Sequence, residues 1–377
     1  MLRHSLLLIY RNFKRFRSTF FINLIGLSTG LACTLLIYLW VNDELHVDKF
    51  HEKDSRLFQV MEHRSHADGI ATSAETPELL AETLAAEMQE IEYAAVSTPP
   101  AWFPRIALSI DGKTIKAAGN FVGKDYFNIF SYELIQGNKN HVLRDQNAIV
   151  LSEQLALRLF HTTENIIGKT VVWQFDYLKK TTLISGVFKG TPANSSVQFD
   201  FLLSFESFKE IMGMKTLTSN GPFLTYLTVK EGTEIGRLNG KINRLLESRF
   251  KGSSRHLFLK PFSENYLYGK YENGVQTGGR IEYVKLFSLI ALFILVIACI
   301  NFMNLSTAKA SRRIKETGIK KALGAGRKLL IFQYLGESML MACLSLLTAL
   351  LLVVLLLPSF NQITGKQLAL VLTPIFS

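Results

Sequence analysis

The stretch LFSLIALFILVIACINFMNLSTA, residues 286–308, decides the fold because it contains 23 consecutive residues without a charged side chain. An α-helix rises about 1.5 Å per residue, so this stretch can cross a hydrocarbon core of roughly 30 Å. Residues 19–41 and 338–365 are also uncharged, although Pro358 interrupts the second of these stretches. A long buried helix of a soluble protein normally shows a polar stripe, and these stretches show none. The sequence therefore predicts three transmembrane helices, at 19–41, 284–307 and 329–357.

The first stretch has one alternative interpretation, a secretory signal preceded by basic residues. Its 23 residues exceed a signal core of about 7–15 residues, and no small-x-small cleavage site follows Val41. We therefore expect an uncleaved membrane anchor.

The distribution of charge predicts the orientation of these helices. The chain has 42 Lys and Arg against 31 Asp and Glu, a net charge of +11, but 48% of its residues are hydrophobic and 19% are charged. This composition argues against a nucleic-acid-binding protein. Residues 1–18 carry five basic and no acidic residues, and residues 308–328 carry eight basic residues and Glu316. Because basic flanks stay in the cytoplasm, we expect both segments inside and residues 42–283 outside.

The external segment, 42–283, shows a mixed pattern of short strands and helices. We expect strands at 57–63, 105–110, 114–118, 148–151, 171–175, 181–188, 225–229 and 256–261, and helices opening at Thr76, Ser152 and Thr233. The fold class is thus an α-helical membrane protein with a large α+β extracytoplasmic domain built of β-α-β pieces and hairpins. Cys33, Cys299 and Cys343 all fall in the apolar stretches, so this domain has no disulfide support.

Several motif matches do not indicate catalysis. Residues 26–30 fit G-x-S-x-G, but Ser28 would lie within the membrane without a titratable neighbour. Gly26 and Gly30 are better explained as a small-xxx-small contact with another helix, or as glycines without a role. The histidines at 46, 51, 63 and 66 lack accompanying ligands, so we interpret them as solvated surface residues. The sequence has no Walker A phosphate loop, so any ATP is expected to bind a partner chain. We expect no enzyme activity, catalytic residue, cofactor or metal.

Three polar residues in the apolar stretches have two possible explanations each. Asn301 and Asn304 either form hydrogen bonds across helices or lie at the headgroup boundary. Glu337 either faces protein within the membrane or lies at the interface, with the span starting near Ser338.

The segment 308–328 is compatible with a short helix that stops at Gly324. Ile314, Ile319, Ala322 and Leu323 share an apolar side, and the remaining side chains are mostly Lys and Arg. Contact with anionic lipid headgroups would explain the charge. A rigid helix at the cytoplasmic face would also suit docking to a soluble protein.

Together these stretches resemble the FtsX/MacB-like ABC transporter permeases. The matching sequences in the C-terminal part are INFMNLSTA at 300–308, ETGIKKALGA at 316–325 and Glu337-Ser338. The external segment resembles the MacB-like periplasmic core domain through DYFNIF at 125–130 with Gly137, IVLSE at 149–153, IGK at 167–169, and GVF at 186–188 through Asn194-Ser195-Ser196.

The resemblance implies a permease subunit of the bacterial inner membrane, with residues 1–18 cytoplasmic, 42–283 periplasmic and an FtsX-like permease domain at 284–377. It implies a homodimer or pseudo-dimer that works with a cytoplasmic ABC ATPase in export, extraction or mechanotransmission. The ATPase-coupling residues would be Arg313, Lys315, Glu316, Gly318, Lys320, Lys321 and Gly324.

The chain departs from the family in one respect. The family has a fourth helix, so residues 358–377 would be an external tail of a product truncated before it. The alternative function is an extracytoplasmic sensor that works with a partner kinase.

Overall fold

The computed structural model describes residues 17–213, 221–249, 255–312, 314–324 and 326–370. The chain divides into two compact units. One is helical and contains the residues up to Leu45 and those from Glu282 onward, and the other, His46–Ile281, is an α/β domain.

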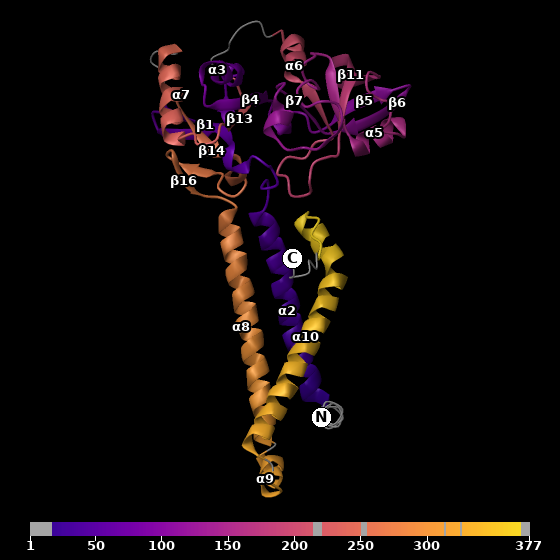
Figure 1. Ribbon diagram of the computed structural model, residues 1–377, viewed down its shortest axis with the longest axis vertical. Helices are drawn as coiled ribbons and strands as arrows, with labels where there is room; N and C mark the ends of the chain where they lie inside the picture. The colour runs from indigo at the N-terminus through magenta and orange to yellow at the C-terminus, as the bar shows by residue number, and fades with distance from the viewer. Residues whose placement is uncertain (1–16, 214–220, 250–254, 313, 325, 371–377) are drawn as a thin grey trace. The chain divides into compact units, whose positions relative to one another are not determined.

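Within its described residues, the helical unit contains three helices long and apolar enough to cross a membrane (Figure 1). They are α2 (Arg17–Leu45), α8 (Ile281–Arg312) and α10 (Arg327–Thr364), and the short helix α9 (Ile314–Ala322) lies between the last two in sequence. The segments that could lie in the membrane are Phe20–Leu45, Ile281–Ala308 and Leu330–Thr364.

The third long helix extends further than the sequence suggests. We expected it to end at residue 357, but α10 continues through Pro358 to Thr364 and ends at Gly365, whose φ is 65°. Proline removes one main-chain hydrogen bond from a helix. Leu357 and Phe360, on either side of Pro358, pack into the hydrophobic cluster shared with α2, which explains why the helix persists here.

The α/β domain is built on a mixed sheet with two halves (Figure 1). The first half-sheet has the order β14-β1-β13-β4, with β2 beside β1 and β3 beside β13. The second half-sheet has the order β7-β12-β9-β11-β10-β5-β6, with β8 beside β11. In the described part of the chain, β4 and β7 are paired through Ser97 and Val122 alone.

The first half-sheet comprises β1 (Leu57–His66), β2 (Gly69–Ser73), β3 (Glu75–Thr76), β4 (Ile91–Ser97), β13 (Phe223–Val229) and β14 (Arg255–Pro261), with helices α3 (Leu80–Glu87) and α7 (Ile235–Arg249). The second comprises β5 (Ile106–Ile110), β6 (Lys113–Ala117), β7 (Gly119–Val122), β8 (Leu134–Gln136), β9 (Ala148–Ser152), β10 (Thr170–Phe175), β11 (Leu178–Phe188) and β12 (Phe201–Ser204), with helices α4 (Tyr126–Ile129), α5 (Glu153–Phe160) and α6 (Phe205–Ile211). A separate hairpin of β15 (Lys270–Glu272) and β16 (Val275–Gly278) precedes α8.

Local sequence signals explain some of these elements and fail for others. Asp111 and Gly112 both have positive φ and join β5 to β6 in a tight hairpin, as expected. Ser152 caps α5, since its Oγ accepts the N–H of Leu155 at 3.2 Å. Thr76 opens no helix, because it pairs with Phe223 in the sheet. The expected cap at Thr233 is also wrong, because its Oγ1 donates to the carbonyl of Lys230 at 2.7 Å.

Candidate functional site

The predicted coupling residues lie on and around α9. Gly318 and Lys321 are exposed on this helix, and Gly324, with a φ of 88°, ends the segment before α10 begins. Arg313 lies outside the described residues. Helix α9 also contains Lys315, Glu316 and Lys320, and the structure describes only the backbone of these three residues.

The described side chains of this segment expose apolar as well as cationic groups. Ile314, Ile319 and Leu323 are 69%, 62% and 82% exposed. Ile319 and Leu323 are four residues apart, so they lie on one face. The hydroxyl of Thr317 is 2.8 Å from that of Tyr334, which fastens α9 to α10. The segment thus presents an apolar, basic surface on a short helix held against its neighbour.

The contact between α2 and α8 runs along the two glycines of the G-x-x-x-G match. A Cβ built on Gly30 would lie 2.5 Å from the Cβ of Ala298, and one built on Gly26 would lie 3.1 Å from Nδ2 of Asn301. Four residues beyond Gly30, Oγ1 of Thr34 lies 3.4 Å from the carbonyl oxygen of Ala291. The backbones of the two helices therefore approach closely at Gly30.

The other predicted packing residues are placed differently. Asn304 is exposed on α8, and Glu337 is half-buried within α10. Glu337 lies ten residues into α10, a rise of about 15 Å. Helix α10 is continuous at this point, so the two explanations for Glu337 stay open.

A different face of α2 packs against α10. Ala32 and Leu36 of α2 form a buried cluster with Ala349 and Val353 of α10. In Figure 1, α2 lies between α8 and α10 in the upper half of the helical unit, and α10 crosses α2 further down. Helix α2 therefore contacts both other long helices, with small residues at each contact.

One ion-pair cluster at the end of α2 was missed from the sequence. Nζ of Lys366 lies 2.8 Å from Oδ2 of Asp43 and 2.9 Å from Oε1 of Glu44. Burial alone would lower the pKa of Lys366, but its hydrogen bonds and ion pairs with Asp43 and Glu44 raise it above the usual value. Asp43 and Glu44 had been interpreted as orientation signals, and nothing in the local sequence predicts a partner more than 300 residues away.

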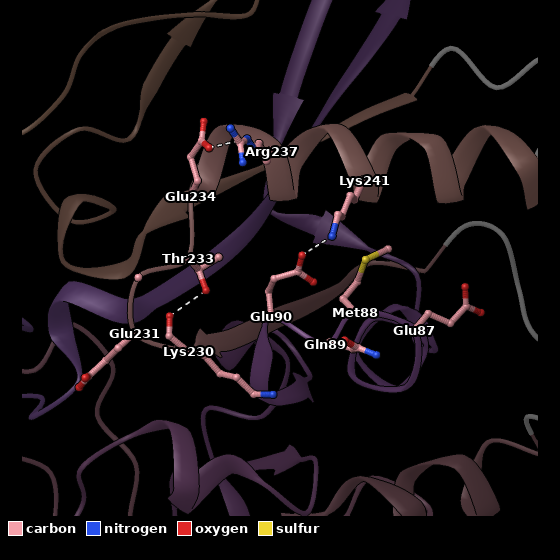
Figure 2. Close-up of a pocket in the computed structure, with 11 residues that line it drawn as sticks. Glu87, Met88, Gln89, Glu90, Lys230, Glu231, Thr233, Glu234, Arg237 and Lys241 are labelled. Atoms are coloured by element: carbon pink, nitrogen blue, oxygen red, sulfur yellow. Dashed lines mark hydrogen bonds and ion pairs between the residues drawn. The ribbon is translucent and has the colours of Figure 1, made fainter.

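The α/β domain has an open pocket of about 830 Å³ near the start of α7 (Figure 2). Its charged side chains have both signs: Glu87, Glu90, Glu231, Glu234, Lys230, Arg237 and Lys241. Lys241 forms an ion pair with Glu90, and its hydrogen bond lowers the pKa of that carboxyl group. Arg237 pairs with Glu234 at 2.6 Å. Most of this charge is paired within the chain, so the pocket has no net anion or cation preference.

No metal centre is evident in the described ranges of the chain. No group of three or more His, Cys, Asp or Glu side chains within those ranges could hold an ion.

Comparison with known proteins identifies the class. The model of the MacB-like periplasmic core domain matches residues 20–245, more than half of the chain, and the model of the FtsX-like permease C-terminal domain matches residues 288–377. The chain belongs to the FtsX/MacB-like family of ABC transporter permeases. It is an inner-membrane protein with a periplasmic α/β domain.

Individual relatives are more distant. The macrolide export ATP-binding/permease protein MacB of Salmonella typhimurium is 24% identical over 252 residues, which cover 65% of this chain and 36% of that protein. The protein of the same name from Neisseria gonorrhoeae is 26% identical over 226 residues, covering 58% and 32%. The chain thus spans about a third of the length of these curated relatives.

Solved structures with a similar domain include a permease domain from Porphyromonas gingivalis, with a TM-score of 0.47, 22% identity, and coverage of 56% of this chain and 93% of that one. The periplasmic region of MacB from Actinobacillus actinomycetemcomitans gives a TM-score of 0.37 and 17% identity, covering 53% and 87%.

Proposed function

We propose that this chain is a permease subunit that couples ATP hydrolysis by a separate cytoplasmic ATPase to movement of its periplasmic domain. The observation that carries this proposal is α9, a short exposed helix with apolar and basic side chains between two membrane-spanning helices. An ATPase that closed on ATP would push on this helix. The force would then reach α2 and α8, which lead in sequence to the two ends of the α/β domain.

The proposal includes an orientation and an oligomeric state. Residues 1–18 and 308–328 are cytoplasmic, and α2, α8 and α10 make three passes. The excess of basic residues in those two segments supports this orientation. Two permease units act together, a state supported by family membership. The outcome of the cycle is export, extraction or mechanotransmission.

Co-purification with an ABC ATPase tests the docking site. The chain is expressed with each ABC ATPase subunit of the same genome, and the complex is quantified. The double variant Ile319→Glu/Leu323→Glu should weaken binding at least about tenfold, because two apolar contacts of about 1.5–3 kcal/mol each are replaced by charges. Lys321→Glu should weaken it less.

Lys328→Glu is the matched control for Lys321→Glu, because Lys328 is also exposed but lies in the first turn of α10. It should leave binding unchanged. If the double variant bound the ATPase as well as the natural sequence does, α9 would not be the docking site. Equal thermal melting of all variants would show that the changes act on binding alone.

A further inference from the structure

The segment that follows α2 in the chain is fastened to the second half-sheet. Asp48 is 1% exposed and has a φ of 62°, a conformation that residues other than glycine rarely adopt. Its N–H donates to the carbonyl of Asn194 at 2.9 Å, and its Oδ1 accepts the N–H of Ser196 at 2.8 Å. The side chain of Asn194 donates back to the carbonyl of His46 at 3.1 Å. These bonds hold the segment against the loop that leads to β12.

His51, three residues further on, is buried in this interface, contrary to the expectation of a solvated histidine. It is 3% exposed, and its Nδ1 accepts the N–H of Ser131 at 3.2 Å. Oγ of Ser131 in turn accepts the N–H of Glu52 at 2.9 Å. Nε2 of His51 is buried and has no hydrogen-bond partner among the residues that the structure describes. The ring is therefore held as a neutral imidazole with Nε2 carrying the proton.

The ring of His51 also contacts the segment that leads to α8. Its centroid lies 5.2 Å from that of Phe130 and 5.6 Å from that of Tyr132, both after β7 in the second half-sheet. It lies 5.6 Å from that of Phe262, which directly follows β14 of the first half-sheet. His51 thus packs beside residues from the two halves. Phe130 also contacts Tyr226 and Phe262 directly, at 5.1 Å between ring centroids in each case, so His51 adds to an aromatic cluster that joins the halves.

Leu267, five residues after Phe262, contacts the start of α8, although the β15–β16 hairpin between them in sequence is largely exposed. The N–H of Ile281 donates to the carbonyl of Leu267 at 3.1 Å. Gly279 has a φ of 145°, and a Cβ there would lie 2.6 Å from the oxygen of Leu267 and 2.9 Å from the nitrogen of Gly269. Displacement of Phe262 would therefore reach the start of α8 through the contact of Leu267 with Gly279 and Ile281.

We propose that residues 47–51 form a joint between the segments connected to α2 and α8, and that protonation of His51 loosens this joint in acid. The joint would make the packing of these two segments within the α/β domain dependent on pH. This inference concerns the α/β domain alone and does not require an ATPase partner.

The surroundings of His51 favour the neutral ring. Burial lowers its pKa to about 4. Among the described residues in ring or hydrogen-bond contact with His51, Tyr132 is the titratable one. Burial raises its pKa above the usual value, so it stays neutral. Glu264, two residues after Phe262, is exposed. Asp48, on the same segment as His51, has the opposite effect on the pH dependence of stability. Burial raises the pKa of its carboxyl group, so its protonation stabilises the packed segment as the pH falls. The contribution of His51 must therefore be isolated by substitution.

Hydrogen exchange on the full chain in nanodiscs tests the joint. Exchange is measured by mass spectrometry at pH 7.5, 6.0 and 5.0, normalised to intrinsic rates, for peptides covering 47–53, 129–134 and 262–269. Because the ordinary pKa is 6.5 and the buried one is about 4, protection should fall by up to about 25-fold between pH 7.5 and 5.0 in all three peptides. Strand β9 should be unaffected.

His51→Phe should retain the ring contacts and abolish this pH dependence, and the exposed His66→Phe should leave it intact. His51→Gln keeps a hydrogen-bond acceptor but does not titrate in this range, so its protection should also be independent of pH. Either of two results would overturn the proposal: pH dependence that persists in both His51 variants, or loosening of 47–53 while 262–269 stays protected.

Discussion

At the scale of single residues, Gly30 determines how closely α2 and α8 pack. Gly30→Ala would bring two Cβ atoms to 2.5 Å, so the helices must separate. We expect a loss of about 1–3 kcal/mol in stability, the usual cost of overpacking. Gly336→Ala is the matched control, because a Cβ at Gly336 meets nothing within 4 Å. The measurement is SDS-induced unfolding of the purified chain.

The double variant Gly30→Ala/Ala298→Gly separates close packing from other effects of the alanine. It moves the methyl group from Ala298 of α8 to position 30 of α2 and should recover most of the lost stability. If Gly30→Ala were no more destabilising than Gly336→Ala, or if the double variant showed no recovery, the contact between Gly30 and Ala298 would not stabilise the helix pair.

At the scale of elements, Lys366 connects the end of α10 to the end of α2. Lys366→Met would leave Glu44, 2% exposed, without this ion pair. We expect a loss of about 1.5–3 kcal/mol, typical of a hydrogen bond to a charged group. Lys189→Met removes an ion pair with Glu133 in which both side chains are about two-thirds exposed, so it should cost at most about 1 kcal/mol. Thermal melting in detergent compares the two.

The melting experiment also has a clear negative outcome. Equal shifts for Lys366→Met and Lys189→Met would show that the cluster at the end of α2 behaves as an ordinary surface ion pair. A larger shift for Lys366→Met, restored in part by Lys366→Arg, would identify the positive charge as the stabilising group.

At the scale of the whole molecule, the sequence predicts the elements whose formation depends on residues close together in the chain. The three apolar stretches predict three long helices because more than 20 uncharged residues in a row is itself the signal. The hairpin at Asp111-Gly112 and the cap at Ser152 are local as well. His51 and Lys366 could not be placed, because their surroundings come from residues distant in sequence. The helix through Pro358 likewise depends on packing against α2.

The last prediction concerns the orientation of the whole chain, for which the charge distribution is the argument. Cys33, Cys299 and Cys343 are first replaced by Ala, and single cysteines are placed at Lys321 and Tyr177, which are both exposed. A membrane-impermeant maleimide applied to cells with a permeabilised outer membrane should label Tyr177→Cys. Lys321→Cys should react only after the inner membrane is disrupted, because the basic residues flanking α8 and α10 predict that α9 lies in the cytoplasm. Labelling of Lys321→Cys while the inner membrane is still intact would show that the chain has the opposite orientation. Helix α9 would then lie outside the cytoplasm, where it could not dock a cytoplasmic ATPase.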